Sequence, residues 1–433
     1  MSLDVGPHVA HEALESLLPG TLARGLQGSR ILAIAAHVNR LRSEGHEIAN
    51  FTIGDFAPDV FRIPDALRGE IVAHLDAGHT NYPPAVGVPE LRTAVRSFYK
   101  ERLGLDYPDG SVAVGSGARP PIYAACRTIL DPGDVVVYPV PSWNVRYYCY
   151  LNGAEGIALE TKPEDGFMLT AEEVLPHLPK ARMVVLNSPS NPAGTVIQPD
   201  QLKALCDAIV DENAGRVARG ERPCMLLYDQ VYWQLTFEGH DHYSPVTLVP
   251  EMAAYTVHID AISKCWAATG VRVGWTVAPP PLVKRMAPLV GHMGAWAPRA
   301  EQMATAALLR EPARLDPYME GFRGQVKQSL AQLAHGLQSM RDEGLPTDAF
   351  EPQGAIYLSA HFDLIGRTVR GREIRNDEDL RSLILEEAGT AIVPFSAFGY
   401  PDGSGWVRFS VGACAGPAIT GALQRIHTLL KEA

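Results

Sequence analysis

Short apolar runs rich in β-branched residues alternate with helix-length segments between residues 112 and 279. This pattern is typical of a parallel sheet whose strands are joined by helices that cover its faces. Strands are predicted at residues 111–115, 134–138, 182–187, 225–229, 255–259 and 273–277. Helices are predicted at residues 121–130 and 201–212, and Thr170 with Glu173 has the form of a capping box that opens another. The arginine-rich stretch 213–222 is expected to be a loop insertion at the surface.

The pattern changes after Pro312. Residues 318–343 predict one long amphipathic helix, because apolar residues recur there three or four positions apart. A strand at 355–359, a helix at 377–387, two short strands around Ile392 and Val407, and a closing helix at 417–431 follow. We therefore expect an α/β lobe followed by an α+β lobe.

The composition supports a globular protein and excludes several classes of function. The 433 residues are 46% hydrophobic and 20% charged, which is enough apolar material for a large core. A net charge of −11 leaves no basic excess for nucleic acid or anionic lipid, so neither partner is expected. No apolar run approaches the ~20 residues that cross a bilayer.

The cysteines and the N-terminus indicate a cytoplasmic protein. The six cysteines are scattered without a Cys-x-x-Cys pair, as expected for reduced thiols, and no metal site is predicted. Residues 1–20 lack the basic start and unbroken apolar run of a signal peptide.

The segment from Ala261 to Trp275 carries the most chemical information. Lys264 follows an apolar strand, where partial desolvation would lower the pKa of its amine and make it a competent nucleophile. Arg272 lies eight residues later in a Gly-x-Arg-x-Gly turn and could bind a phosphate. Taken alone, the segment fits equally well a surface loop on which the lysine and the arginine bind no ligand.

Three further segments favour a ligand site. Asn191 lies between prolines in a turn-rich loop after a strand, and Asp229 ends another apolar strand, where a buried carboxylate needs a partner. Residues 112–121 run from a strand through a glycine-rich turn into a helix opened by prolines, an arrangement that can hold an anion. Individually, the Asn191 loop also fits an ordinary turn, Asp229 also fits a structural salt bridge, and residues 112–121 also fit an ordinary helix start.

Taken in order, the segments resemble the fold-type I pyridoxal 5′-phosphate (PLP) enzymes, and among them the class I/II aminotransferases that include the aspartate aminotransferases. The resemblance extends from about Asn50 to Gly412. It implies an α/β fold whose large domain has a mostly parallel seven-stranded sheet covered by helices, plus a smaller α+β domain. The implied units are residues 1–57, contributing to the small domain, 58–311, the PLP-binding domain, and 312–433, the small C-terminal domain.

The resemblance also implies roles around the PLP ring. Lys264 matches the lysine that binds the cofactor covalently and then moves a proton as general base. Asp229 matches the aspartate paired with the ring nitrogen. Tyr232 and Asn191 match the two residues that hydrogen-bond the 3′-oxygen, and Trp143 lies where an aromatic side chain stacks on the ring.

Other matches concern the cofactor phosphate. Gly117, Ala118, Ser263 and Arg272 fall at positions that hold the phosphate. Tyr82 matches a tyrosine that reaches the phosphate from the neighbouring subunit, so the resemblance implies a homodimer.

The substrate side is implied by three residues. Arg408, in Trp406-Val-Arg-Phe-Ser410, matches the arginine that binds the substrate α-carboxylate, and Gly54 and Asn191 match residues on the same side. Arg119 lies where some bacterial aspartate aminotransferases place a lysine near the distal carboxylate of the substrate. It would bind the distal carboxylate of a dicarboxylic substrate. The alternative is that it points to solvent or only supports the phosphate, because Pro120 and Pro121 alter the local backbone relative to the family.

The sequence therefore predicts a cytoplasmic, homodimeric PLP-dependent aminotransferase that moves an amino group between an L-amino acid and a 2-oxo acid. Other PLP reactions on the same scaffold are the first alternative: a β-lyase, a decarboxylase or a cyclopropane-forming synthase. A non-catalytic PLP-binding sensor domain is the second, although the basic DNA-binding segment of such regulators has no counterpart in the roughly fifty residues before Gly54.

Overall fold

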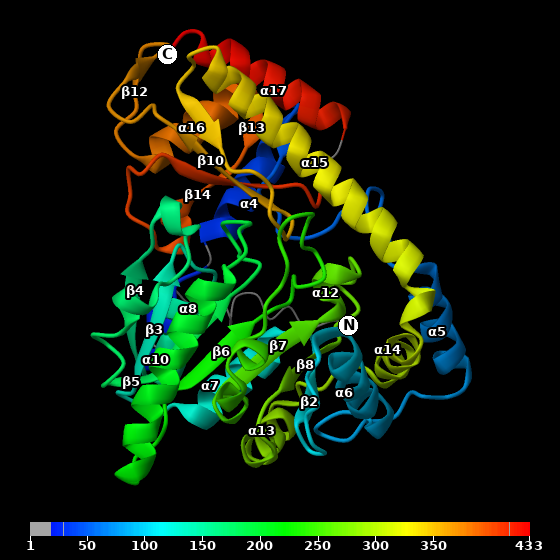
Figure 1. Cartoon of the computed structure of the whole chain (residues 1–433). Coiled ribbons are helices and arrows are strands. Elements are labelled where there is room, and N and C mark those ends of the chain that lie inside the picture. Colours follow the sequence, from blue (N-terminus) through cyan, green and yellow to red (C-terminus); the bar gives the residue numbers. More distant parts are fainter. Residues whose placement is uncertain (1–18, 29, 415) are drawn as a thin grey trace, which may run out of the picture.

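The computed structural model describes residues 19–28, 30–414 and 416–433, and its lower half is built on one sheet (Figure 1). From edge to edge the strands are β2 (Val112–Gly115), β8 (Gly274–Val277), β7 (Thr256–Ala261), β6 (Met225–Asp229), β5 (Ala181–Asn187), β3 (Val135–Val140) and β4 (Glu155–Glu160). β8 is antiparallel to both its neighbours, and the other pairs are parallel. The predicted mostly parallel, seven-stranded sheet is confirmed.

Helices cover both faces of this sheet because successive strand residues point to opposite sides. On β5, Val184 packs in an apolar cluster with Leu205 of α10 (Pro199–Ala218). The next residue, Val185, belongs to the cluster on the other face, which includes Ile122 of α7 (Arg119–Ile129). The other helices of this half with eight or more residues are α5 (Asp65–Asp76), α6 (Pro89–Leu103), α8 (Val145–Asn152), α13 (Pro280–Met293) and α14 (Arg299–Arg310). Both faces are therefore buried, and the strand ends are left to form a site.

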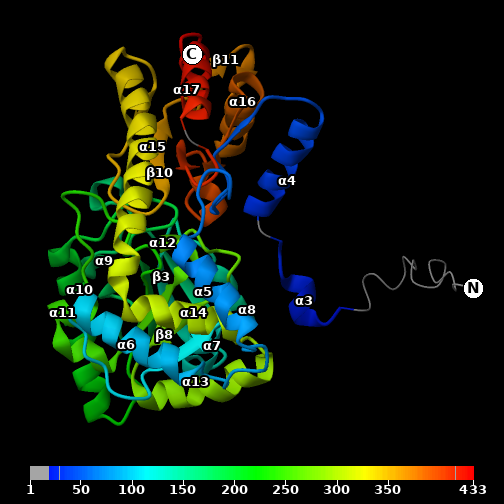
Figure 2. The same ribbon diagram turned by 90° about the vertical axis from the view of Figure 1, so that its right-hand side faces the viewer.

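The upper half is an α+β unit beside this layered structure. Its antiparallel sheet has the order β14 (Val393–Pro394), β15 (Trp406–Ser410), β10 (Tyr357–Phe362) and β9 (Thr347–Ala349), packed with α16 (Asp377–Ala388) and α17 (Pro417–Leu430). α15 (Asp316–Asp342) runs along the side of the molecule between the two halves (Figure 2), with its predicted apolar stripe buried. The short strand β1 (Ala49–Asn50) pairs with β13 (Thr390–Ala391), so the segment before the large sheet joins this half.

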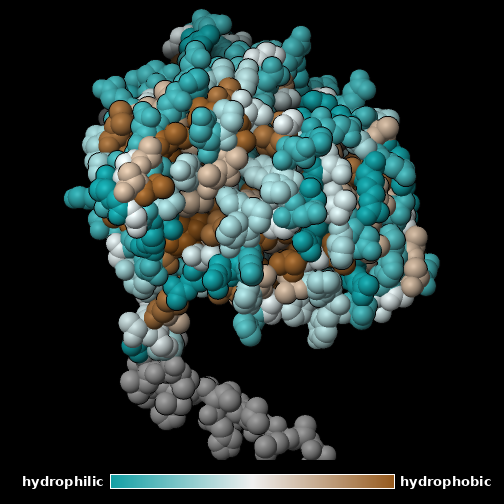
Figure 3. Space-filling model, turned by 60° about the horizontal axis from the view of Figure 1, so that its bottom comes forward, coloured by the Kyte–Doolittle hydropathy of each residue, from teal (hydrophilic) through white to brown (hydrophobic). Residues whose placement is uncertain are grey.

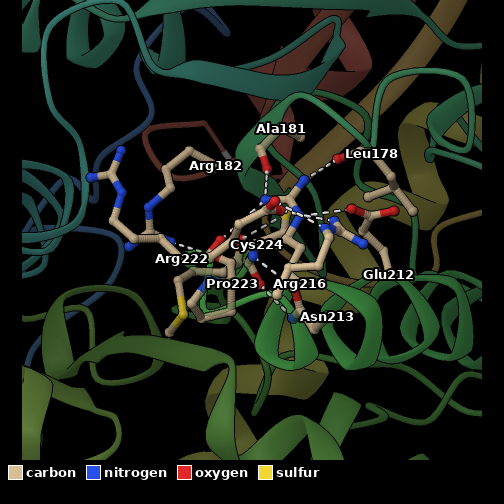
Figure 4. Close-up of polar contacts among 12 residues, drawn as sticks. Leu178, Ala181, Arg182, Glu212, Asn213, Arg216, Arg222, Pro223 and Cys224 are labelled. Carbon is tan, nitrogen blue, oxygen red and sulfur yellow. Dashed lines mark hydrogen bonds and ion pairs between the residues drawn. The ribbon is translucent and has the colours of Figure 1, made fainter.

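The prediction of a surface loop at residues 213–222 is wrong for residues 213–218, and only residues 219–222 form an exposed loop. α10 continues to Ala218, and the buried Asn213 side chain binds both the N–H and the carbonyl of Cys224, at 2.7 and 2.8 Å. Arg216 is buried and donates to the carbonyl oxygens of Ala181, at 2.9 Å, and Leu178 (Figure 4). These polar side chains satisfy buried main-chain groups, a use that composition does not distinguish from solvent exposure.

The surface is mixed in character. Figure 3 shows hydrophobic side chains gathered in patches among hydrophilic ones on one face. Within the described ranges, no helix combines the length and the apolar character needed to cross a membrane. All six cysteines are free and buried.

Candidate active site

A cavity of about 630 Å³ lies at the carboxyl ends of the parallel strands, where open α/β sheets bind ligands. Most of the side chains singled out from the sequence meet in it. They are Gly54, Ala118, Arg119, Trp143, Asn191, Asp229, Tyr232, Ser263, Lys264, Arg272 and Arg408. Gly117 and Tyr82 do not line this cavity.

Lys264 lies on the short helix α12 (Ile262–Cys265), directly after β7. Its Nζ donates a hydrogen bond to the carbonyl oxygen of Gly54 at 2.5 Å. Burial, with a smaller contribution from Arg408 and other nearby guanidinium groups, lowers the pKa of Lys264 to about 8 against the opposing effect of Asp55. The amine therefore loses its proton closer to neutral pH than an ordinary lysine, which a nucleophile and proton carrier requires.

Asp229 ends β6 with its carboxylate facing the cavity. Its main-chain oxygen accepts hydrogen bonds from the Asn187 amide at 2.9 Å and from the Ser188 N–H at 3.1 Å, which fix the strand end. The side chain accepts only the Val231 N–H, at 3.2 Å, among the described residues. Burial raises the pKa of Asp229 to about 7. A carboxyl group this poorly partnered suits a ligand that brings its own positive charge.

An anion site is formed where the glycine-rich turn meets the Arg272 turn. Arg272 donates to the carbonyl oxygens of Thr269, at 2.6 Å, and Ser116, at 2.9 Å. Gly117 has a φ of +77°, and a Cβ on it would collide with the Arg272 guanidinium. The buried hydroxyl of Ser263 has no hydrogen-bond partner among the residues that the structure describes. A hydroxyl that is free to donate and a fixed guanidinium, next to a glycine backbone without a side chain, are suited to bind a phosphate.

Arg408 is only 1% exposed and forms the opposite wall. Its two terminal nitrogens donate to the Asn191 side-chain oxygen at 2.9 Å and to the Thr52 carbonyl at 2.7 Å, and Nε has no partner. The guanidinium also lies 4.6 Å from the ring centroid of Tyr357. A planar donor group held rigidly in this way presents a fixed geometry to a carboxylate.

Tyr357, on β10, is a cavity residue that the sequence did not reveal. Its hydroxyl lies 2.7 Å from that of Tyr232, and a Cβ on Gly54 would stand 2.8 Å from it. The only sequence signal was an aromatic residue in a predicted apolar strand, which is equally typical of core. Its role depends on β10 pairing with β15, the strand that carries Arg408.

Two of the predicted site residues, Arg119 and Tyr82, have exposed side chains. Arg119 is exposed, with its guanidinium 4.5 Å from the ring centroid of Trp143. Tyr82 is 81% exposed and packs edge to face against Trp296, with the ring centroids 5.4 Å apart. Neither side chain forms an ion pair within the described part of the chain.

Comparison with known proteins assigns the family. Residues 46–426 match the model of the family described as "Aminotransferase class I and II". The chain belongs to this family. It is 30% identical to the aspartate aminotransferase of Geobacillus stearothermophilus over 412 residues, which cover 94% of this chain and 97% of that protein. A probable aspartate/prephenate aminotransferase of Rhizobium leguminosarum is also 30% identical, over 89% of this chain and 92% of that protein.

Solved structures of aminotransferases share the fold. The aspartate aminotransferase of Rhizobium meliloti matches with a TM-score of 0.86 and 26% identity, over 96% of this chain and 99% of that chain. That of Thermus thermophilus, solved with maleate, matches with a TM-score of 0.83 and 26% identity, over 95% and 99%. The chain is thus a fold-type I, PLP-dependent aminotransferase.

The residues of the cavity fit this cofactor. The partnerless hydroxyl of Ser263 and the Arg272 turn suit its phosphate, and the poorly partnered Asp229 suits its protonated ring nitrogen. When bound, PLP supplies an electron-withdrawing ring that stabilises negative charge at the substrate α-carbon.

Proposed function

We propose that this aminotransferase works on dicarboxylic amino acids and 2-oxo acids. The observation that carries the proposal is that two guanidinium groups besides that of Arg272, those of Arg408 and Arg119, line the same cavity. Arg408 is buried and rigid, as an α-carboxylate site requires, whereas Arg119 stacks on Trp143 and pairs with no carboxylate of the described residues. The relatives support the same substrate class, because their names include aspartate and prephenate and one structure was solved with maleate.

The proposed roles of the other residues follow from their positions. Lys264 holds the cofactor and moves the proton at its Nζ, which Gly54 orients through its carbonyl. Asp229 keeps a positive charge on the ring nitrogen through a charge-assisted hydrogen bond. Tyr232, together with Asn191, holds the ring oxygen.

The phosphate and ring face have their own set of residues in this proposal. Gly117, Ala118, Ser263 and Arg272 bind the phosphate. The large flat side chain of Trp143 covers the ring and excludes water from it.

Replacement of Arg119 tests the substrate class. Arg119→Ala should lower kcat/KM for glutamate by about 10- to 100-fold while leaving that for alanine within about 2-fold, because only glutamate has a distal carboxylate for the fork to bind. Arg119→Lys should recover part of the loss. Arg146→Ala is the matched control, since Arg146 also stacks on an aromatic ring, Tyr147, at 4.6 Å, but lies outside the cavity. An unchanged preference for glutamate over alanine in Arg119→Ala would exclude the role.

We further propose that the enzyme is a cytoplasmic homodimer in which Tyr82 completes the phosphate site of the partner subunit. Tyr82 supports this because it is exposed yet fixed against Trp296. Exposed Val72 and Leu75 on α5 and Met293 at the end of α13 provide apolar surface of the kind that a second copy would cover. The free, buried cysteines suit a reducing compartment.

A further inference from the structure

A buried carboxyl group lies behind the cavity without lining it. Asp260 is on β7, four residues before Lys264, and its exposure is 0%. Its Oδ2 accepts the indole N–H of Trp233 at 2.9 Å and the hydroxyl of Tyr99 at 3.3 Å. Its Oδ1 accepts the N–H of Ala261 at 2.7 Å. All three contacts use Asp260 as an acceptor.

The direction of the Tyr99 hydrogen bond follows from its other partners. The Tyr99 oxygen lies 3.3 Å from both the amide nitrogen of Gln230 and the indole nitrogen of Trp275. Both nitrogens only donate, so they use the two lone pairs of the hydroxyl, and its proton is left for Asp260. An asparagine cannot replace Asp260, because either orientation of the amide places its NH₂ against the N–H of Trp233 or of Ala261.

The donors come from the turns that carry the proposed cofactor residues. Trp233 ends the turn that follows Asp229 and contains Tyr232, and Ala261 begins the turn that contains Lys264. Tyr99, on α6, donates to the same carboxylate from a third segment. The carboxylate thus connects two segments that must keep a fixed spacing for one cofactor to reach both.

A structural carboxylate in this place is not favourable by itself. Burial, with a smaller contribution from the negative charge of Asp229, raises the pKa of Asp260 to about 8 against the opposing effect of the three donors. A neutral hydrogen-bonding or apolar residue would avoid this cost, so its presence calls for an explanation beyond packing.

We propose that Asp260 is a positioning residue of the reaction: its carboxylate fixes the Asp229–Tyr232 turn relative to the Lys264 turn. This inference rests on the proposed roles of those three residues. It does not depend on the proposed preference for dicarboxylic substrates.

The test compares purified holoenzymes of the wild type and of Asp260→Asn. The PLP dissociation constant should rise and kcat should fall by about 10-fold each, because small displacements of reacting groups cost this much or more. KM for the amino donor should stay within about 2-fold, since Arg408 and Asn191 are on other segments. Borohydride reduction and peptide mapping of the wild type first check that PLP is attached to Lys264. A label on Lys284 or another lysine would overturn both the proposed role of Lys264 and this inference.

Asp377→Asn is the control for the loss of a buried carboxylate. Asp377 is also 0% exposed and accepts the Gly405 N–H at 3.1 Å, but it lies at the start of α16, away from the cavity. This variant should lower the melting temperature without changing kcat or the PLP dissociation constant. If Asp260→Asn behaves in the same way, Asp260 is purely structural and the inference is overturned.

Trp233→Phe gives an independent variant that keeps the carboxylate and removes one donor. It should change kcat and the PLP dissociation constant in the same direction as Asp260→Asn, by a smaller factor. The double variant should be no worse than Asp260→Asn alone, because both changes break the same connection. If the two substitutions together raised the PLP dissociation constant by the product of their separate factors, the proposal would be contradicted. This dissociation constant can be measured whichever amino donor the enzyme uses.

Discussion

Asp229 lowers the stability of the cofactor-free folded chain, although its carboxylate is the proposed partner of the cofactor ring. Its folded-state pKa of about 7 lies above the ordinary value of 3.8, so the folded chain holds a proton that the unfolded chain has released. Without the cofactor, stability therefore falls as pH rises from about 3.8 to about 7 and stays reduced above that range. A cation opposite Asp229 would remove this penalty.

Asp229→Asn should therefore change stability and activity in opposite directions. At pH 8 the cofactor-free variant should be more stable than the wild type by about 4 kcal/mol, and at pH 4 the difference should fall below about 1 kcal/mol. Transamination should fall by several orders of magnitude, because the charge-assisted hydrogen bond is lost in a desolvated site. Urea unfolding at the two pH values and steady-state kinetics provide the measurements. Equal stability at pH 8, or near wild-type turnover, would show that Asp229 is not a strained partner of the ring.

The cavity shows which residues a sequence can reveal. Lys264, Asp229 and Asn191 each follow a recognisable strand and lie in short motifs, so local sequence indicated that they would meet at one sheet edge. Tyr357 and Asp260 have no such local signal. Their contacts join segments far apart in the chain, for example Tyr232 with Tyr357, and only the folded chain brings these together.

At the scale of elements, the six strands predicted for the large sheet lie within a few residues of β2, β3, β5, β6, β7 and β8, whereas α5, α6, α13 and α14 were not predicted. β4 was missed because it is an edge strand whose side chains are largely exposed, so no continuous apolar run marks it. The end of α10 was missed for the opposite reason, because the polar residues Asn213 and Arg216 are buried there. Composition reports polarity, whereas burial depends on available hydrogen-bond partners.

Arg216 should accordingly contribute far more to stability than its charge suggests. Arg216→Ala leaves the carbonyl oxygens of Leu178 and Ala181 without their donor and Glu212 without its partner. We expect a loss of about 2–4 kcal/mol in the free energy of unfolding. Arg219→Ala, three residues later, removes a side chain that is 56% exposed and pairs with Glu221, and it should leave the free energy of unfolding nearly unchanged. Similar midpoints for the two variants in urea would show that the buried contacts of Arg216 are unimportant.

At the scale of the whole molecule, the proposed homodimer would place Tyr82 of one subunit at the phosphate site of the other. The chain mass is 46.9 kDa, so light scattering should give about twice that value for the active enzyme. An active monomer would remove the basis for an inter-subunit role of Tyr82. A dimer alone would not establish that role, because two copies can associate without sharing a site.

Mixed dimers decide whether Tyr82 acts across the interface. Tyr82→Ala alone should weaken PLP binding about 10-fold, through loss of one hydrogen bond to a charged group. Lys264→Ala alone should be inactive. In a dimer formed from one chain of each variant, the site built on the intact Lys264 receives Tyr82 from the partner and is complete, so the mixed dimer should bind PLP with wild-type affinity at one site and have about half the wild-type activity. If Tyr82 instead serves its own subunit, that site keeps the alanine, and the mixed dimer shows only the weakened binding of Tyr82→Ala. Differently tagged chains, purified in sequence on both tags, isolate the mixed dimer for this measurement.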